Sequence, residues 1–221
     1  MRGALIRCYH STGYLEKVLK NYAWVDKIAL LSYRFLTVAP IEDNTEEIVK
    51  KLDLPNLIYE KGSGIPQHEI FNRGLQLLKD CDSVFISDGD EFILKQDQLQ
   101  IVKEFQERRA TSVICNMYDY AKDYYHILPK RDISEPNRIV AMVNPNAKFV
   151  IIREIKENPS RQIFCNVDIH HFGFVGSQEM LNWKYDWETK EEKIDRKVFD
   201  KIFDNLLPHT PPKEILEILN E

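Results

Sequence analysis

The sequence has 221 residues, a length that suits a single α/β domain with a sizeable core. Its formal net charge is −5, from 35 acidic and 30 basic side chains that are scattered along the chain. This charge distribution lacks the clustered basic side chains of a nucleic-acid-binding protein. No apolar run reaches the ~20 residues that span a bilayer. We expect a soluble protein whose membrane contact, if there is any, is peripheral.

The cysteines indicate a reducing location. The four cysteines lie far apart and show no Cys-x-x-Cys spacing: Cys8, Cys81, Cys115 and Cys165. Three of them lie in apolar runs, where a free thiol behaves as a small hydrophobic side chain. The apolar run near residue 1 is too short for a signal peptide. The sequence therefore predicts reduced cysteines and a cytoplasmic protein.

Strands and helices alternate over the first half of the sequence. Strands are expected in short apolar runs at residues 4–8, 27–35, 57–59 and 83–87. Helices are expected at residues 14–22, 44–54, 66–78 and 97–108, with a glycine-containing loop at 61–66. Asn44 and Glu47 have the spacing of a capping box that opens the second helix. This alternation predicts a mostly parallel sheet with helices on both faces, which binds ligands at the carboxyl ends of its strands.

The second half of the sequence is less regular. A strand is expected at residues 111–117 and a polar, tyrosine-rich segment at residues 118–135. Residues 138–143 and 148–152 flank Asn144-Pro145-Asn146, which predicts a hairpin. The remaining expected elements are a strand at 162–168, the run His170–Phe174, and helices that begin near Ser177, Asp195 and Thr210. No repeat or low-complexity linker interrupts the chain, so we predict one domain.

The acidic cluster Asp88-Gly89-Asp90-Glu91 directly follows the fourth expected strand. Side chains alternate along a strand, so Asp88 and Asp90 can point the same way. Two carboxylates at a strand end form an oxygen site suited to Mg²⁺ or Mn²⁺. The alternative is a solvated turn, since this tripeptide also occurs in ordinary turns. An EF-hand is excluded, because its sixth and twelfth positions would hold Ile93 and Leu99.

Two segments resemble one enzyme family. Residues 68–75 contain an Asn-x-Gly-Leu sequence, and residues 82–93 contain the acidic cluster followed by Phe92-Ile93. This order resembles GT-A fold glycosyltransferases near family 2, in which such a helix precedes a strand that ends in an Asp-x-Asp motif. Farther on, residues 171–175, with Met180 and Lys184, are similar to a His-aromatic-Gly-aromatic-Val motif of the same enzymes. The resemblance covers about residues 1 to 190.

The resemblance implies one GT-A-like, Rossmann-like domain that transfers a sugar with the help of a divalent metal. Residues 1–110 would bind a nucleoside diphosphate sugar, residues 111–190 would face the acceptor, and residues 191–221 would form a helical tail. The implied metal ligands are Asp90, Asp88 and His171, with Asp88 contacting either the ribose or the metal. The expected donor-binding residues are Tyr9, His10 and Ser11 after the first strand, with Asn72, Asp88 and Lys184. A histidine beside carboxylates favours Mn²⁺ over Mg²⁺.

The acceptor side is expected in the second half of the chain. An inverting transfer, favoured by analogy with family 2, needs a base for the proton of the acceptor hydroxyl. The candidates are Asp119, Asp123 and Asp168. The tyrosines of the segment 118–125 form either a wall that stacks on sugars or a segment packed over the sheet. One departure from family 2 concerns base recognition, because its acidic residue at the end of the second strand is replaced by Ser32-Tyr33-Arg34.

The predicted function is an enzyme that transfers a sugar from a nucleoside diphosphate sugar to a hydroxyl of a glycan, lipid or protein. Two alternatives stay open. One is a nucleotidyltransferase or another metal-dependent phosphoryl-transfer enzyme, which normally has a Gly-rich basic loop after its first strand; residues 8–14 lack one. The other is a nucleotide- or carbohydrate-binding module without turnover.

Overall fold

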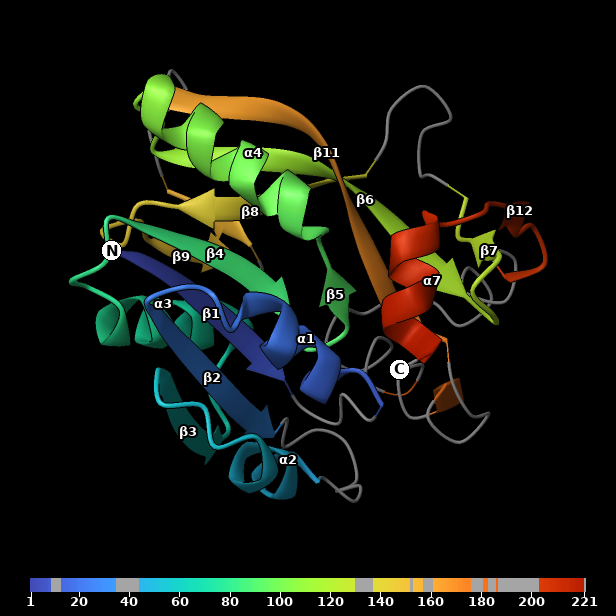
Figure 1. Ribbon diagram of the computed structural model, residues 1–221, viewed down its shortest axis with the longest axis horizontal. Coiled ribbons are helices and arrows are strands. Elements are labelled where there is room, and N and C mark those ends of the chain that lie inside the picture. Colours follow the sequence, from blue (N-terminus) through green and yellow to red (C-terminus); the bar gives the residue numbers. More distant parts are fainter. Residues whose placement is uncertain are drawn as a thin grey trace.

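A computed structural model gives the arrangement of the chain. It describes residues 1–8, 13–34, 44–129, 137–151, 153–156, 161–175, 181–182, 186 and 203–220. Within them the protein is an α/β structure built around one twisted mixed sheet (Figure 1). None of the helices in these ranges is long and apolar enough to cross a membrane.

Four parallel strands form the side of the sheet built by the first half of the chain. They are β1 (Arg2–Cys8), β2 (Lys27–Arg34), β3 (Leu57–Ser63) and β4 (Ser83–Asp88). Their order is β4-β1-β2-β3, and each neighbouring pair is parallel. Parallel strands covered on both faces are continuously apolar, and this explains the buried runs of β1, β2 and β4, whereas β3 is at the edge of the sheet and is only partly buried. All four expected strands are present.

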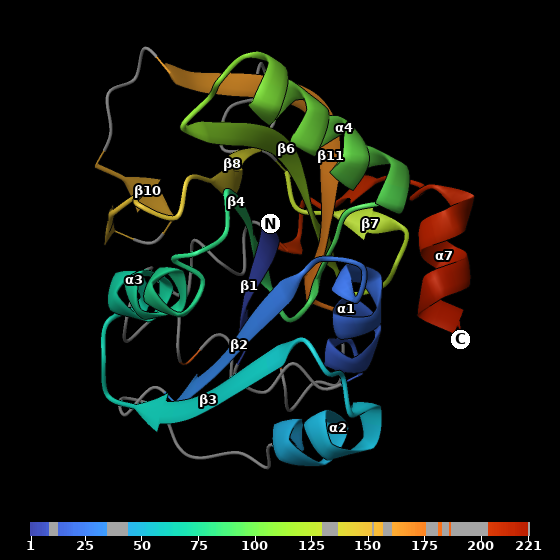
Figure 2. The same ribbon diagram turned by 60° about the vertical axis from the view of Figure 1, so that its left-hand side comes forward.

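Helices cover both faces of these strands because successive strand residues point to opposite sides. The helices are α1 (Leu15–Tyr22), α2 (Thr45–Leu52), α3 (Gln67–Leu77) and α4 (Lys95–Glu107). Leu5 and Leu31 pack in one buried cluster with Phe71 of α3, whereas Ile6 and Leu30 belong to the other buried cluster. Figure 2 shows α3 on one side of the sheet and α1 and α4 on the other. The predicted α/β fold with helices on both faces is confirmed.

The second half of the chain extends the sheet with mostly antiparallel strands. They are β5 (Glu91–Phe92), β6 (Ser112–Ala121), β7 (His126–Ile127), β8 (Asn137–Val143), β11 (Gln162–Phe174) and β12 (Leu207–Pro208). Strand β8 lies between β4 and β6 and is antiparallel to both. Strand β11 runs parallel to β6 and also pairs with the short β5. This part of the sheet joins the end of β4 to residues far along the chain.

The hairpin predicted around Asn144-Pro145-Asn146 is wrong. Strand β8 pairs with β4 and β6, whereas β9 (Phe149–Ile151) pairs with β10 (Glu154–Ile155) in a separate two-stranded sheet. The turn does form, since the Ala147 N–H donates to the Asn144 carbonyl at 2.9 Å. The chain leaves the main sheet there, because Phe149 packs on α3 instead of returning along β8.

Two expectations on element boundaries and one on a helix cap need correction. Residues 61–63, expected in a loop, continue β3 because they pair with residues 32–34 of β2. Residues 118–121, expected in a polar segment, continue β6 beside β11. Helix α2 begins after Asn44 as expected, but the Asn44 side chain makes no capping hydrogen bond. In the first two cases pairing with a neighbouring strand extends an element beyond its apolar run.

The C-terminal helix α7 (Lys213–Asn220) packs against the first helix of the chain. Its Ile215 and Leu219 belong to the same buried cluster as the apolar face of α1. The Lys17 ammonium of α1 donates to the Ile218 and Leu219 carbonyls at 2.9 and 2.7 Å. These carbonyls have no partner within the helix, so Lys17 caps its C-terminus. The helices expected from Ser177 and Asp195 fall almost entirely outside the described residues.

Candidate functional site

The acidic cluster lies where three strands meet. Strand β4 ends at Asp88, and β5 begins at Glu91 directly after the Gly89-Asp90 turn. Glu91 pairs with His171 of β11, and His171 pairs in turn with Asp119 of β6. The Phe172 N–H donates to the Asp90 carbonyl at 2.9 Å. Strand pairing therefore brings residues from distant parts of the chain, such as Asp90 and Phe172, to the carboxyl end of β4.

His171 lies between two carboxylates. Its Nδ1 is 2.6 Å from Asp119 Oδ1, and its Nε2 is 3.5 Å from Asp90 Oδ1. The other Asp119 oxygen accepts a hydrogen bond from the Asn137 amide at 2.9 Å. Burial alone would lower the pKa of His171, but Asp90 and Asp119 outweigh it and raise the pKa to about 10. The two carboxylates thus favour the protonated form of His171, which lies between them.

Two arginines contact the first aspartate of the motif. Arg7 is the register partner of Asp88 on β1 and forms a two-pronged ion pair, with Nε–Oδ1 and Nη2–Oδ2 distances of 2.8 and 2.6 Å. Arg153 Nη2 lies 3.7 Å from Asp88 Oδ1. Burial alone would raise the pKa of Asp88, but Arg7 and Arg153 outweigh it and hold the pKa below its ordinary value. Both oxygens of Asp88 are thus already paired with cations.

Glu91 forms a buried ion pair with Arg153. The guanidinium donates to the two Glu91 oxygens at 2.8 and 2.6 Å, and the two side chains are only 3% and 5% exposed. The Asp88 N–H also donates to Glu91, at 3.0 Å. Glu91 therefore holds the turn through buried contacts, whereas the Asp90 side chain faces His171.

Arg7 and Arg153 were not predicted as site residues. A signal for Arg7 was present, because a charged residue stands within the apolar strand run Ile6-Arg7-Cys8. No local pattern distinguishes Arg153, which lies 62 residues after its partner Glu91. Only the folded chain brings it to the acidic turn.

The other described candidates lie in different surroundings. The Asn72 side chain makes two hydrogen bonds with the Phe149 backbone, at 3.0 and 2.9 Å. Asp168 accepts from Asn116 at 3.1 Å and, by strand alternation from His171, points to the opposite face of β11. Asp123 lies in the turn before β7 and contacts His126 Nδ1 at 2.8 Å. The structure thus brings Asp90, His171 and Asp119 together, with Asp88 and Glu91 beside them.

Four expected donor-binding residues cannot be placed against this site. Tyr9, His10 and Ser11 follow β1, and Lys184 follows β11, but all four lie outside the described residues. Their assignment stays a prediction.

The tyrosines of β6 pack against the C-terminal segment. Tyr118 stacks on His209, with ring centroids 4.5 Å apart, and Tyr120 stacks on Phe172 at the same separation. The Tyr120 hydroxyl is 3.0 Å from His170 Nδ1. Burial, together with His209, lowers the pKa of His170 to about 4, so this histidine is neutral. Tyr118 and Tyr120 therefore belong to the sheet itself, with rings packed on His209 and Phe172, and they form neither a separate segment over the sheet nor an open sugar-stacking wall.

Asp90 and His171 offer two donor atoms to a divalent metal. In the ranges that the structure describes, no group of three or more His, Cys, Asp or Glu side chains surrounds a common metal position. Mg²⁺-type ions in nucleotide enzymes, however, use only one or two protein ligands together with substrate phosphates and water. Asp90 Oδ1 and His171 Nε2 are two such donors 3.5 Å apart. Asp119 on Nδ1 is the usual outer partner of a metal-bound histidine, so these residues fit the group.

Solved structures show which fold this is. S. aureus TarS, residues 1–349 in complex with UDP, superposes with a TM-score of 0.50 at 12% identity, over 91% of this chain and 69% of that one. Glucosyl-3-phosphoglycerate synthase from Mycobacterium tuberculosis, in complex with Mn²⁺, UDP and phosphoglyceric acid, gives a TM-score of 0.40 at 12% identity, over 54% and 43% of the two chains. The likeness to TarS shows that the protein has a GT-A-like fold.

Three further TarS structures match this chain over a smaller share of their length. The chain spans 47%, 45% and 42% of the length of three further TarS structures, with TM-scores of 0.45 to 0.49. No protein-family model matches the sequence, and no curated protein matches it either. At such identities the likeness defines the fold alone.

Proposed function

We propose that the protein is a glycosyltransferase that takes its sugar from a nucleoside diphosphate sugar with the help of a divalent metal. The observation that carries the proposal is the contact of Asp90 with His171, backed by Asp119, at the carboxyl end of β4. In open α/β sheets this is where ligands bind. TarS, whose fold is similar, has been solved in complex with UDP, and this supports a nucleotide-linked donor here.

Each residue of the site then has a defined task. Asp90 and His171 would hold Mn²⁺ or Mg²⁺, and a histidine ligand favours Mn²⁺. When bound, such an ion neutralises the negative charge that develops on a departing diphosphate. Asp119 fixes the tautomer of His171 so that Nε2 faces Asp90. Asp88, paired with Arg7 and Arg153, serves the site by shaping the turn instead of supplying a metal ligand.

The three candidates for the acceptor base lie in different surroundings. Asp119 is engaged through both oxygens by His171 and Asn137, so we assign it to orienting His171. Asp168 points to the other face of β11. Asp123 lies in an exposed turn and is paired with His126. Asp123→Asn and Asp168→Asn separate these two: the base variant loses turnover and retains donor binding.

A thermal-shift experiment tests the donor and metal assignment. UDP with Mn²⁺ is expected to raise the melting temperature of the wild-type protein, since a ligand that binds only the folded state stabilises it. Asp90→Ala should abolish this rise, and His171→Ala should reduce it strongly. An unchanged rise in Asp90→Ala would sink the metal assignment.

Turnover assays then separate the enzyme classes. A panel of UDP- and GDP-sugars with Mn²⁺ should yield free nucleoside diphosphate, slowly by hydrolysis and faster when a hydroxyl acceptor is supplied. Pyrophosphate release from a nucleoside triphosphate and a sugar phosphate would instead identify a nucleotidyltransferase. Tight UDP binding with no product from any donor would identify a binding module.

A further inference from the structure

Arg153 occupies an unusual position for a turn residue. It lies between β9 and β10 and has a backbone φ of +39°, in the left-handed region that non-glycine residues rarely adopt. Its neighbour Glu154 is exposed, yet Arg153 itself is 7% exposed. Strained backbone of this kind persists only where the surrounding structure enforces it. The turn therefore places this guanidinium inside the protein.

The Arg153 guanidinium contacts the acidic turn on its buried side. It donates to both oxygens of Glu91, and Glu91 in turn accepts the N–H of Asp88 at 3.0 Å. Arg153 also lies 3.7 Å from the Asp88 carboxylate. In the sequence, Asp90 lies between Asp88 and Glu91, the two residues that these contacts hold. Arg153 therefore contacts both residues that flank the Gly89-Asp90 turn.

The anchor of Arg153 is helix α3. Phe149 of β9 exchanges two hydrogen bonds with the Asn72 side chain and packs on Phe71, with ring centroids 5.0 Å apart. Arg153 itself lies over the Phe71 ring at 5.9 Å. Figure 2 shows the β9–β10 segment on the α3 side of the sheet. The segment that carries Arg153 is therefore anchored to helix α3.

We propose that Arg153 is a positioning residue, which sets the geometry of Asp90 for metal–nucleotide binding through its fork on Glu91. The proposal rests on the proposed function, since it concerns the same site. A planar fork that contacts both oxygens fixes a carboxylate in orientation as well as in position. A lysine supplies only a point charge. Arg153→Lys should therefore keep the ion pair and lose the alignment.

The test is calorimetric titration of UDP in the presence of Mn²⁺ into folded wild-type and variant proteins. We expect Arg153→Lys to raise the Kd about 10-fold, the lower end of the effect of losing a direct partner of a metal ligand, because Arg153 acts on Asp90 only through Glu91. The electron paramagnetic resonance spectrum of bound Mn²⁺ should change as well. A purely structural role would lower the melting temperature and leave the Kd of the folded protein unchanged.

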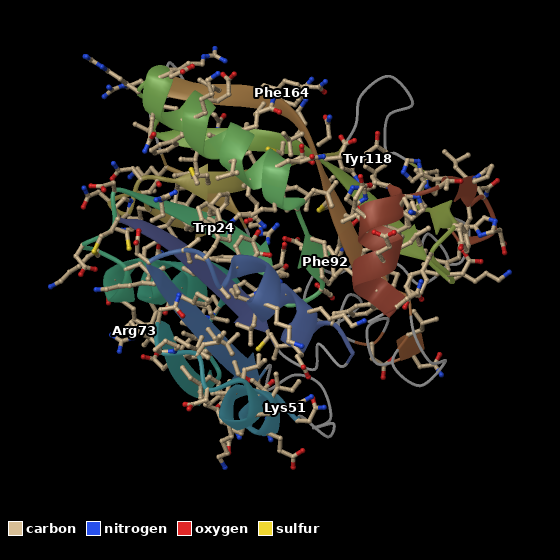
Figure 3. All side chains as sticks on the ribbon, viewed as in Figure 1. Trp24, Lys51, Arg73, Phe92, Tyr118 and Phe164 are labelled. Carbon is tan, nitrogen blue, oxygen red and sulfur yellow. The ribbon has the colours of Figure 1, made fainter. Side chains whose placement is uncertain are left out.

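A matched control exists on the surface. Arg73 also makes a forked contact with a glutamate, donating through Nε and Nη2 to the two Glu60 oxygens at 3.0 and 2.8 Å, but its side chain is 47% exposed. Figure 3 shows Arg73 well separated from Phe92, the neighbour of Glu91. Arg73→Lys should bind UDP and Mn²⁺ as the wild type does.

The outcomes separate the two proposals. Wild-type affinity in Arg153→Lys, alongside loss of binding in Asp90→Ala, overturns the positioning role and leaves the proposed function standing. No UDP binding by the wild type overturns both. If Arg153→Lys does not fold, the double variant Arg153→Met/Glu91→Gln replaces it. That variant removes both charges, so no buried ion lacks a partner, and the same two Kd results apply.

Discussion

Replacing Asp119 with asparagine should weaken Mn²⁺ binding in the presence of UDP while leaving the fold in place. Asparagine has nearly the volume of aspartate, but it lacks the charge that now accepts the Nδ1 hydrogen bond of His171 over 2.6 Å. The imidazole is then free to turn over or to take the other tautomer, in which Nε2 carries a proton and cannot bind a metal. We therefore expect lower affinity because one ligand is no longer preorganised.

The expected magnitude follows from this arrangement. Loss of the outer partner of a metal-bound histidine typically reduces metal affinity about 10- to 100-fold, which corresponds to about 1.4 to 2.7 kcal/mol. The assay is titration of Mn²⁺ at saturating UDP. Circular dichroism and the melting temperature of the free protein check that the fold is retained.

Asp123→Asn is the matched control, because Asp123 also contacts a histidine, His126, at 2.8 Å, but in an exposed turn. Its Mn²⁺ affinity should equal that of the wild type. Equal affinities for Asp119→Asn and the wild type would refute the reasoning. If Asp119→Asn also lost turnover with donor binding intact, Asp119 would be the catalytic base instead.

Three further predictions concern stability. Gly74→Ala places a methyl group 2.6 Å from Leu5 Cγ. Urea unfolding should show that the free energy of unfolding falls by about 1–2 kcal/mol, because the cost of overpacking exceeds the gain in helix propensity. A more stable variant would contradict this. Arg153→Met should cost about 3–5 kcal/mol because it strands a buried carboxylate, and adding Glu91→Gln should recover most of that loss; additive losses would contradict it. Lys17→Met should speed hydrogen exchange in α7 about two- to fivefold, and unchanged rates would show that the cap contributes nothing.

The order of elements in the first half of the chain was readable from the sequence. Apolar runs, helical spacing and the residues that end helices are local features, and they predicted β1 to β4 and the helices between them. The placement of the acidic cluster at the end of β4 follows from the same local pattern. The division into a donor half, an acceptor half and a tail is not tested by this fold and stays a prediction.

Partner choice was not readable in the same way. The two apolar runs around Asn144 suggested a hairpin, because a sequence pattern cannot say which other strand a strand will pair with. The structure places β8 between β4 and β6 and sends β9 to α3. The pairing of β8 and the packing of β9 depend on which surfaces the parallel strands and α3 leave uncovered.

By itself, the sequence determined an α/β chain with carboxylates at a strand end, since these depend on residues a few positions apart. Only the tertiary structure decided what each carboxylate does. Asp88 and Asp90 are two residues apart, yet one pairs with Arg7 and the other faces His171. These partners come from strands 81 positions away along the chain in either direction, and strand register aligns them. Side-chain roles in such a site depend on that register, which no local pattern encodes.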